Sequence, residues 1–365
     1  MKYKPRNNII LYVSVLGMWL VTVLIKLKYN GLVIGFDYGL YHPDGALYTT
    51  RALDWSGYTE TEAVKIVSNW YNIHAFKFNN TKPSDFYYSV HPLYPEYSPR
   101  ILYPLLSIPF IKLFGVPGML VVPALSFLVI LLVVLKIGIE LNKPFVALLT
   151  LVSVSSSSTV VRWMMANTTD ALLAGIFAVT AYCLVRKISS YGWYLVFGVL
   201  VILTGLTRIS ILFWVAIAAV LLIQKNRKKV IFITVVSVLI VIPTLLSNSS
   251  NSFLAVEADR GLWQRIMLYP FYLIKITFYE FAQLFVMDRI LFFMCALSIY
   301  LSFKYINKDS SKYLLLVLFA GLLTGAMNGT VGVNFRYQLP VIAFMCWSII
   351  DNTNISLNGF LKRSK

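Results

Sequence analysis

The chain has 365 residues, of which 58% are hydrophobic and only 13% are charged, and its formal net charge is +17. So little polar surface cannot cover a water-soluble globule, and the composition predicts a membrane protein with several spans. The Lys and Arg residues are scattered in small groups between apolar runs, which argues against a nucleic-acid-binding domain. Cys183, Cys295 and Cys346 lie inside apolar runs, far from the histidines, so neither a disulfide framework nor a zinc site is expected.

The first apolar run, residues 9–25, follows a basic stretch and has no small-residue cleavage site after it, which indicates an uncleaved signal anchor. A helix needs about 20 apolar residues to cross a bilayer. Further spans are expected at 117–138, 144–161, 171–185, 192–206, 209–223, 230–246, 284–303, 313–327 and 338–350. The expected fold is therefore an all-α polytopic membrane protein of about ten transmembrane helices, with residues 1–365 forming one domain.

The basic residues indicate the orientation. With the N-terminus in the cytoplasm, the inner segments hold 17 Lys and Arg residues against three acidic ones, and the outer segments hold 15 against 12. The positive-inside rule favours this arrangement. We therefore expect a multi-pass protein of the plasma (inner) membrane whose chemistry lies on the extracytoplasmic face.

The long first outer loop, residues 26–116, contains seven of the 15 acidic residues and all three histidines. It is too polar to cross the membrane and too aromatic for a disordered linker, so it is expected to form interfacial helices. One such helix is expected at 44–55, after a Pro-Asp-Gly turn, and a second at 98–115. The stretch 262–284, with its Tyr, Phe and Lys content, is also expected at the membrane surface.

The remaining outer loops are short and polar. They comprise 162–170, 207–210, 248–260 and 334–340, and we expect them to converge on one cleft. A carboxylate facing an arginine across such a cleft suits group transfer from a phosphate-linked lipid. The carboxylate would take a proton from an acceptor hydroxyl, and the arginine would hold the leaving phosphate. Asp44 and Arg336 are the predicted pair.

Three short motifs lie at the predicted outer face: Pro43-Asp44-Gly45 followed by Tyr48 and Arg51-Ala52-Leu53, the stretch from Pro92 and Tyr94 through Arg100, Tyr103-Pro104-Leu105 and Phe114-Gly115, and Arg336-Tyr337 with Pro340. Together they resemble the motifs of the GT-C superfamily of membrane glycosyltransferases, nearest to its protein O-mannosyltransferase and aminoarabinose transferase branch. The resemblance covers the order of loops and spans over most of the chain, through short motifs. It implies a polyprenyl-phosphate sugar donor, a catalytic Asp in the first outer loop and often a second acidic residue in the next one, a position that Asp170 occupies here.

On this basis Asp44 is the expected general base, with Asp37 as its competitor, because many relatives have an acidic pair where this chain has Asp44-Gly45. The donor phosphate is expected to contact Arg336, Arg100 and Tyr337. Asp170 and His91 are the candidates for the acceptor side.

Each of these residues also has a plain structural interpretation. Asp44 and Asp170 would each suit the cap of a following helix. Arg336 and Arg100 would suit contact with lipid headgroups, and Arg208 has the same two interpretations. For His91 a surface hydrogen bond is favoured over acid–base chemistry.

Other patterns carry less information. Asp37 and Asp44 would share a divalent cation only if the turn between them folds back, so no metal site is predicted. The serine-rich run 153–159 suits close helix packing more than a polar cavity. Asn79-Asn80-Thr81 and Asn167-Thr168-Thr169 match the glycosylation acceptor pattern, which recurs by chance.

The sequence thus predicts an inverting glycosyltransferase that moves one sugar from a polyprenyl-phosphate donor to a lipid, glycan or protein acceptor. Its expected partners are the bilayer, the donor and the acceptor, with no nucleic acid and no resident cofactor. One alternative is a lipid-linked polysaccharide polymerase or ligase, although such proteins tend to have their large outer loop late in the chain. The other is a transporter or flippase, which would need ionisable residues near the middle of its spans.

Overall fold

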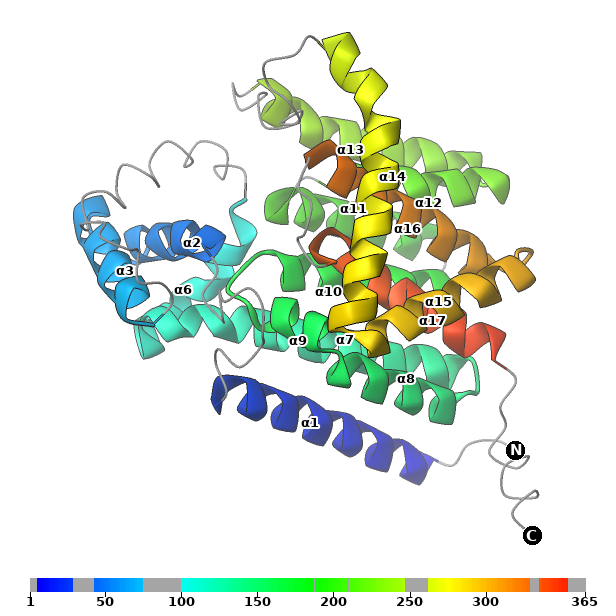
Figure 1. The fold of residues 1–365 in the computed structure, drawn as a ribbon, viewed down its shortest axis with the longest axis horizontal. Coiled ribbons are helices and arrows are strands. Elements are labelled where there is room, and N and C mark those ends of the chain that lie inside the picture. The colour runs from blue at the N-terminus through cyan, green and yellow to red at the C-terminus, as the bar shows by residue number, and fades with distance from the viewer. Residues whose placement is uncertain are drawn as a thin grey trace.

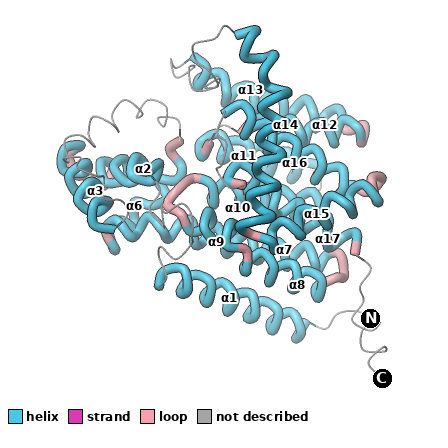
Figure 2. The backbone as a smooth tube through the Cα atoms, in the orientation of Figure 1, coloured by secondary structure: helices cyan, strands magenta, loops and turns pink. Residues whose placement is uncertain are grey.

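The computed structural model describes residues 5–28, 43–74, 100–186, 188, 190–208, 210–246, 262–328 and 335–353. These residues form helices joined by loops and turns, and they include no strand (Figure 2). Together with the apolar character of the helices, this confirms a helical membrane protein.

Figure 1 shows the described helices, coloured in chain order. The first four are α1 (Pro5–Lys28), α2 (Pro43–Asp54), α3 (Glu60–His74) and α6 (Leu102–Phe114). The central ones are η2 (Val116–Leu120), α7 (Val121–Glu140), α8 (Pro144–Ser156), α9 (Ser158–Met165), α10 (Asp170–Arg186), α11 (Ser190–Thr207), α12 (Ile211–Ile223) and α13 (Arg227–Leu246). The last are α14 (Leu262–Met287), α15 (Arg289–Lys304), α16 (Asp309–Asn328), η4 (Arg336–Val341) and α17 (Ile342–Asn352).

Within the described residues the ten expected spans coincide largely with helices, but the span 284–303 is interrupted at Asp288, where α14 ends and α15 begins. By length and apolarity, three segments of the described chain could cross a membrane: Ile9–Lys28, Val116–Glu140 and Asp309–Ala326. The pair α8 and α9 would make a fourth, bent by 73°. Membrane crossing by the remaining, shorter helices stays a prediction.

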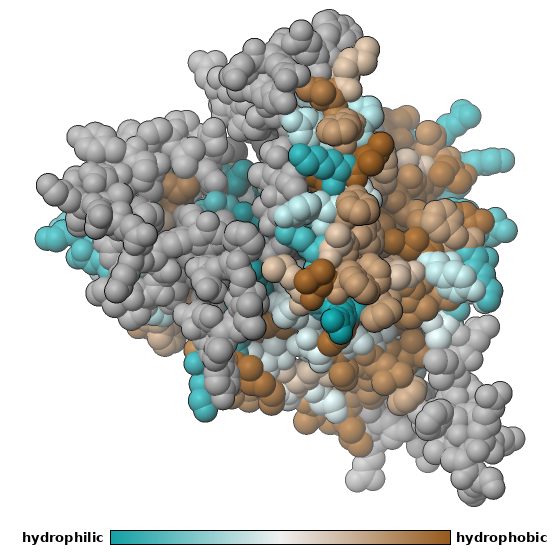
Figure 3. All heavy atoms as spheres, in the orientation of Figure 1, coloured by the Kyte–Doolittle hydropathy of each residue, from teal (hydrophilic) through white to brown (hydrophobic). Residues whose placement is uncertain are grey.

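The surface supports immersion in lipid. Large apolar side chains are exposed on α1, α13, α14 and α15, among them Ile9 (65%), Leu239 (63%), Phe278 (77%) and Phe293 (62%). In Figure 3 apolar residues cover much of the face formed by the later helices, with hydrophilic residues at the rim. Exposed apolar surface of this extent requires an apolar solvent.

The predicted span 144–161 is wrong as a single helix, because the chain breaks at Ser157. The Ser157 hydroxyl accepts a hydrogen bond from the backbone N–H of Val160 at 3.1 Å and so caps α9. It also donates to the buried carboxylate of Asp288 at 2.6 Å. The same carboxylate accepts from the backbone N–H of Thr159 and, at the start of α15, from that of Leu291. The serine run therefore marks a helix break stabilised by Asp288, rather than a packing stripe.

The same break corrects the predicted loop 162–170. Its first four residues continue α9, which ends at Met165, so only the stretch up to Asp170 connects two helices. The connecting residues Asn167, Thr168 and Thr169 are all fully or almost fully buried. They lie inside the protein, between the helix bundle and the group formed by α2, α3 and α6.

Two of the predicted interfacial helices correspond to α2 and α6. They lie together with α3 at one end of the molecule, left in Figure 1, and share a core that includes Tyr48, Tyr71 and Tyr103. This core continues through η2 into the start of α7. Asp37 and His91 fall outside the described residues, so the structure does not place them.

The larger core belongs to the helix bundle. Helix α10 packs along α7, and η4 contacts α10, α16 and α17. Helix α14 runs steeply across α15 and α16, with which it is in contact (Figure 1). The N-terminus of α10 and the start of η4 lie where the bundle meets the α2–α3–α6 group, because Arg336 of η4 bonds to Asp170 of α10 and to Asp44 of α2.

Candidate functional site

Asp44 comes from the first turn of α2. Pro43 opens this helix, a position where its missing N–H costs nothing. The Asp44 side chain is 21% exposed. It therefore presents a carboxylate at the junction between α2 and the bundle while remaining accessible to a ligand.

Arg336 joins this carboxylate to a second one. Its Nη2 donates to Asp44 Oδ2 at 2.5 Å, and its Nε donates to Asp170 Oδ2 at 2.7 Å. The other oxygen of Asp170 accepts from Arg208 Nη1 at 2.8 Å. The chain thus brings together residues 44, 170, 208 and 336 in a cluster of two arginines and two carboxylates, which we call the Asp44–Arg336 cluster.

The cluster is buried unevenly. The side chains of Asp170 and Arg336 are 2% and 8% exposed, and that of Arg208 is 11% exposed. Charges so far from water are stable only when they are paired and hydrogen-bonded, as these are. Asp44 is the most exposed member, so a substrate could approach it most readily.

Asp170 precedes the predicted span 171–185. Burial opposes its ionisation, but the guanidinium groups of Arg336 and Arg208 outweigh burial and hold the pKa of Asp170 below its usual value. Asp170 therefore remains an anion that positions both arginines. This makes it a poor proton acceptor, and Asp44 the better candidate for that role.

Two aromatic rings cover the arginines. The Arg208 guanidinium carbon lies 4.6 Å from the centre of the Tyr337 ring, and that of Arg336 lies 5.0 Å from the Trp163 ring. Cations at this range are attracted to the ring face and held in a planar orientation. The Tyr337 ring packs against Arg208, and its expected contact with phosphate stays a prediction.

A sharp backbone turn directs Arg336 into the cluster. Phe335, the residue before it, has a φ of 64°, in the left-handed region that costs free energy for a residue with a side chain. The buried Glu280 of α14 accepts a hydrogen bond from the Phe335 N–H. Helix α14 thus stabilises the turn from which Arg336 projects.

Gly45 explains why this chain lacks an acidic pair after Asp44. A Cβ at position 45 would lie 2.1–2.3 Å from the carboxamide atoms of Asn167, so no larger residue fits without displacing that side chain. Asn167 is fully buried and donates to the hydroxyl of Tyr71 at 2.5 Å. Asn167 thus packs against Gly45 of α2 and bonds to Tyr71 of α3, which holds both helices against the loop before α10. Because it is buried, Asn167 is inaccessible as a glycosylation acceptor.

The other expected site residues have mixed outcomes. Arg336 is not a headgroup-contacting residue, because it is buried and paired with two carboxylates. Arg100 donates to the hydroxyl of Tyr48 at 3.0 Å, beside α2, and its role with phosphate stays a prediction. The Asp170 carboxylate binds two arginines, so its helix-cap interpretation does not account for it.

The sequence did not single out Trp163 or Gln338, and it gave Asn167 only as a glycosylation pattern. Gln338 follows Arg336 by two residues and is 1% exposed, and neither polar atom of its carboxamide has a partner among the described residues. In the sequence, only its position two residues after Arg336 pointed to Gln338 as part of the site. For Trp163 and Asn167 no local signal existed, because their partners are distant in sequence.

Several donors of the cluster remain available. Within the described ranges, Nη1 of Arg336 and Nε and Nη2 of Arg208 make no hydrogen bond. The cavity beside them, lined by Thr324 and Tyr337 among others, measures about 10 Å³, the space of about one water molecule. A larger ligand would therefore have to displace side chains of the cluster, and an anion would find N–H groups ready to donate.

No set of three or more His, Cys, Asp and Glu side chains suited to a metal ion occurs in the part of the chain that the structure describes. Asp37, which the sequence paired with Asp44, lies outside that part.

Comparison of the chain with protein-family models, with curated proteins and with solved structures found no match.

Proposed function

We propose that the protein is a membrane glycosyltransferase of the inverting type. It transfers one sugar from a polyprenyl-phosphate donor to an acceptor hydroxyl on the extracytoplasmic face of the plasma membrane. The observation that supports this most directly is the Asp44–Arg336 cluster, in which an accessible carboxylate lies beside guanidinium groups with N–H donors to spare. The resemblance of the sequence motifs around Asp44 and Arg336 to those of GT-C glycosyltransferases also supports it.

In this mechanism the acceptor oxygen attacks the anomeric carbon of the donor sugar. The bond from that carbon to the phosphate oxygen breaks, and polyprenyl phosphate leaves with the bonding electrons. Asp44 takes the proton of the acceptor hydroxyl. Arg336 and Arg208 stabilise the negative charge that develops on the phosphate.

The contact between Arg336 and Asp44 implies an order of events. While Nη2 of Arg336 donates to Oδ2 of Asp44 at 2.5 Å, this carboxylate oxygen is engaged and does not face an acceptor hydroxyl. A donor phosphate would compete for Arg336 and release Asp44 to accept a proton. Asp170 would keep Arg336 and Arg208 in place throughout, because it contacts both.

The test is a transfer assay with the purified full chain in detergent and a panel of radiolabelled polyprenyl-phosphate sugars. Wild type should release polyprenyl phosphate, and Asp44→Asn should lower the rate about 10²–10⁴-fold. Arg336→Lys, which retains the charge but loses the forked geometry, should raise KM for the donor. Asp54→Asn, an exposed carboxylate at the other end of α2, is the matched control and should behave as wild type.

Thermal unfolding of each variant separates loss of chemistry from loss of fold. Full activity of a folded Asp44→Asn protein would exclude Asp44 as the base and direct attention to Asp37. No turnover by folded wild type with any donor would contradict the proposal. A chelator arm tests the Asp37–Asp44 cation hypothesis, since activity lost with chelator and restored by Mg²⁺ would require a metal.

A further inference from the structure

A cavity of about 630 Å³ opens at the far end of the helix bundle. Cys183 and Val185, near the C-terminus of α10, contribute to its wall, whereas Asp170 of the Asp44–Arg336 cluster is the first residue of the same helix. At 1.5 Å per residue, the two regions are about 20 Å apart along α10. The cavity is therefore separate from the candidate active site.

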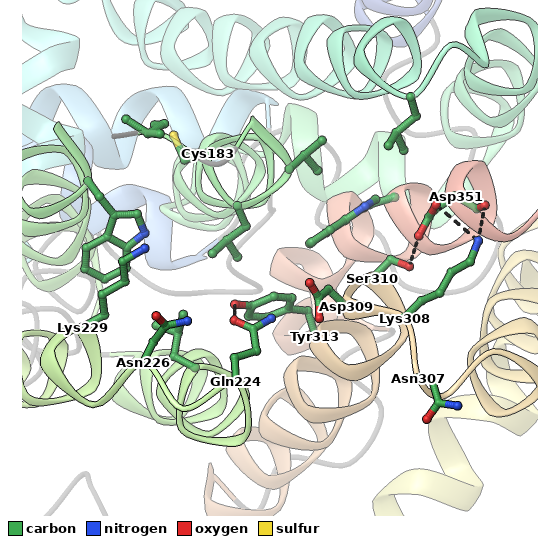
Figure 4. A pocket seen from close by; sticks show the side chains of 17 residues that line it. Cys183, Gln224, Asn226, Lys229, Asn307, Lys308, Asp309, Ser310, Tyr313 and Asp351 are labelled. Atoms are coloured by element: carbon green, nitrogen blue, oxygen red, sulfur yellow. Dashed lines mark hydrogen bonds and ion pairs between the residues drawn. The ribbon is translucent and has the colours of Figure 1, made fainter. Parts of the chain in front are cut away.

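Its polar residues come from helix ends and the turn between α15 and α16 (Figure 4). Lys229 and Asn226 lie on one side, Lys308 and Asp351 on the other, and Gln224, Tyr313 and Asp309 between them. The aromatic rings of Trp193, Tyr313 and Trp347 form part of the wall. A volume of several hundred Å³ that combines aromatic walls with polar side chains on several sides suits a small polar organic ligand.

The two lysines differ in what they contact. Lys308 is engaged, because its Nζ lies 3.4 Å from Asp351 Oδ1 and 2.9 Å from the Asp351 carbonyl oxygen. Ser310 donates to the other carboxylate oxygen of Asp351 at 2.7 Å. Lys229 has no acidic partner in the described residues, and its ammonium lies 4.7 Å from the centre of the Trp193 ring. Lys229 is thus the cation of this cavity that an anionic ligand could bind.

The surroundings favour such an anion. Arg186, Lys225, Arg227 and Lys228 lie at the same ends of α10, α12 and α13, and they create a positive potential at the mouth. Partial burial disfavours the charged form of Lys229 and lowers its pKa. A bound anion would stabilise this charged form. Asn226 and Asp309 supply amide and carboxylate oxygens, which accept hydrogen bonds from hydroxyl groups. The amide oxygen of Gln224 already accepts from the Tyr313 hydroxyl at 3.5 Å and has one further lone pair for a ligand hydroxyl.

We propose that this cavity is a second ligand site, which binds a phosphate ester carrying free hydroxyl groups. The phosphate contacts Lys229, and the hydroxyls contact Gln224, Asn226 and Asp309. Such a group is presented by a soluble glycerol or sugar phosphate and by the headgroup of an anionic lipid, and both share the chemistry that the cavity recognises. The charge distribution predicts that this end of the bundle faces the cytoplasm, where either source would reach it.

The experiment measures binding to the full chain in detergent. The soluble probe is sn-glycerol 3-phosphate, followed by calorimetry, and the lipid probe is dioctanoyl phosphatidylglycerol, counted by native mass spectrometry. Dioctanoyl phosphatidylcholine is the zwitterionic control, which lacks headgroup hydroxyls. Lys229→Gln should weaken binding at least about tenfold. Lys228→Gln, which changes an exposed lysine that does not line the cavity, should weaken binding much less, because it alters only the screened potential at the mouth.

Saturable binding of both probes would show that the site recognises the phosphate ester without needing the acyl chains. Binding of the lipid only would show that the ligand is a lipid headgroup. Equal effects of Lys229→Gln and Lys228→Gln, equal binding of phosphatidylcholine, or no saturable binding of either probe would overturn the proposal. If Lys229→Gln does not fold, Asn226→Ala provides the test. It should reduce the preference for glycerol 3-phosphate over inorganic phosphate, and an unchanged preference would exclude recognition of the hydroxyls.

Discussion

At the scale of single residues, Arg336 is the position on which the candidate site depends. Removing a guanidinium group from water costs several kcal/mol, and two carboxylates with direct hydrogen bonds offset this cost. The two carboxylates differ in exposure, since the Asp44 side chain is 21% exposed and that of Asp170 only 2%. We therefore expect the buried Asp170 to position the two arginines, and the more exposed Asp44 to contact the substrate.

Asp170 should give the protein a characteristic acid sensitivity. Its folded-state pKa lies below the unfolded value of about 3.9, so its ion pairs contribute stability above that value and lose it as pH falls through the folded-state pKa. We expect the melting temperature of wild type in detergent to drop more between pH 5 and pH 3 than that of Asp170→Asn. At pH 7 the variant should be less stable by about 3–5 kcal/mol, because it leaves two arginines without their shared anion.

Asp54→Asn, which alters an exposed carboxylate of α2, is the control for this measurement and should follow the wild-type curve. Parallel pH profiles for wild type and Asp170→Asn would show that Asp170 does not stabilise the fold through its charge.

At the scale of elements, contacts between helix ends determine how the α2–α3–α6 group sits on the bundle. The first turn of α2 approaches the loop before α10 so closely that only glycine fits at position 45. Asn167 fills the contact and bonds to Tyr71 of α3. The position of Asp44 relative to Arg336 depends on this fit.

Gly45→Ala should therefore destabilise the protein by about 1–3 kcal/mol through overpacking. The cost should largely vanish in an Asn167→Ala background, because the atoms that the new methyl group meets are gone. Thermal unfolding of the wild type, the two single variants and the double variant measures this coupling. Additive effects of the two substitutions would contradict the proposed contact.

A second element-scale contact is the one between the α8–α9 break and the start of α15. Asp288→Ala should lower stability by about 2–4 kcal/mol, because α15 loses its cap and the Ser157 hydroxyl and Thr159 N–H lose their acceptor. Tryptophan fluorescence during thermal unfolding in detergent would report the change. Asp309→Ala, an exposed acid in the first turn of α16, should cost less than about 1 kcal/mol, and equal losses in the two variants would refute the role of Asp288.

At the scale of the whole molecule, the bundle separates two chemical environments. The Asp44–Arg336 cluster lies at one end of α10, and the basic helix ends and the large cavity lie at the other. This polarity agrees with the orientation that the Lys and Arg distribution predicts, with the cluster outside and the cavity inside.

Cysteine labelling in intact cells would test the orientation. All three native cysteines are buried, so a membrane-impermeant maleimide should report introduced residues. Tyr58→Cys, in the exposed turn between α2 and α3, should react in intact cells. Lys228→Cys, at the other end of the bundle, should react only after permeabilisation. The reverse pattern would place the candidate active site in the cytoplasm and contradict an extracytoplasmic donor.

The sequence by itself determined the helical class and the approximate positions of most of the expected helices, although 144–161 and 284–303 each cross a break between two helices. These follow from apolar runs and basic clusters, which are local properties of a short stretch of chain. It also indicated Asp44 and Arg336, because a carboxylate and an arginine in predicted outer segments suit group transfer from a phosphate-linked lipid, and Asp170 through the resemblance to GT-C glycosyltransferases.

Only the tertiary structure decided how these residues meet. Arg336 lies 292 positions from Asp44 and 166 from Asp170, and nothing local specifies that one guanidinium bonds to both. The break at Ser157 depends in the same way on Asp288, 131 positions away, and the glycine at position 45 on Asn167. Hydrophobic patterning is set by solvent and can be predicted along the chain, whereas buried polar groups need particular partners, which the folded chain alone brings into reach.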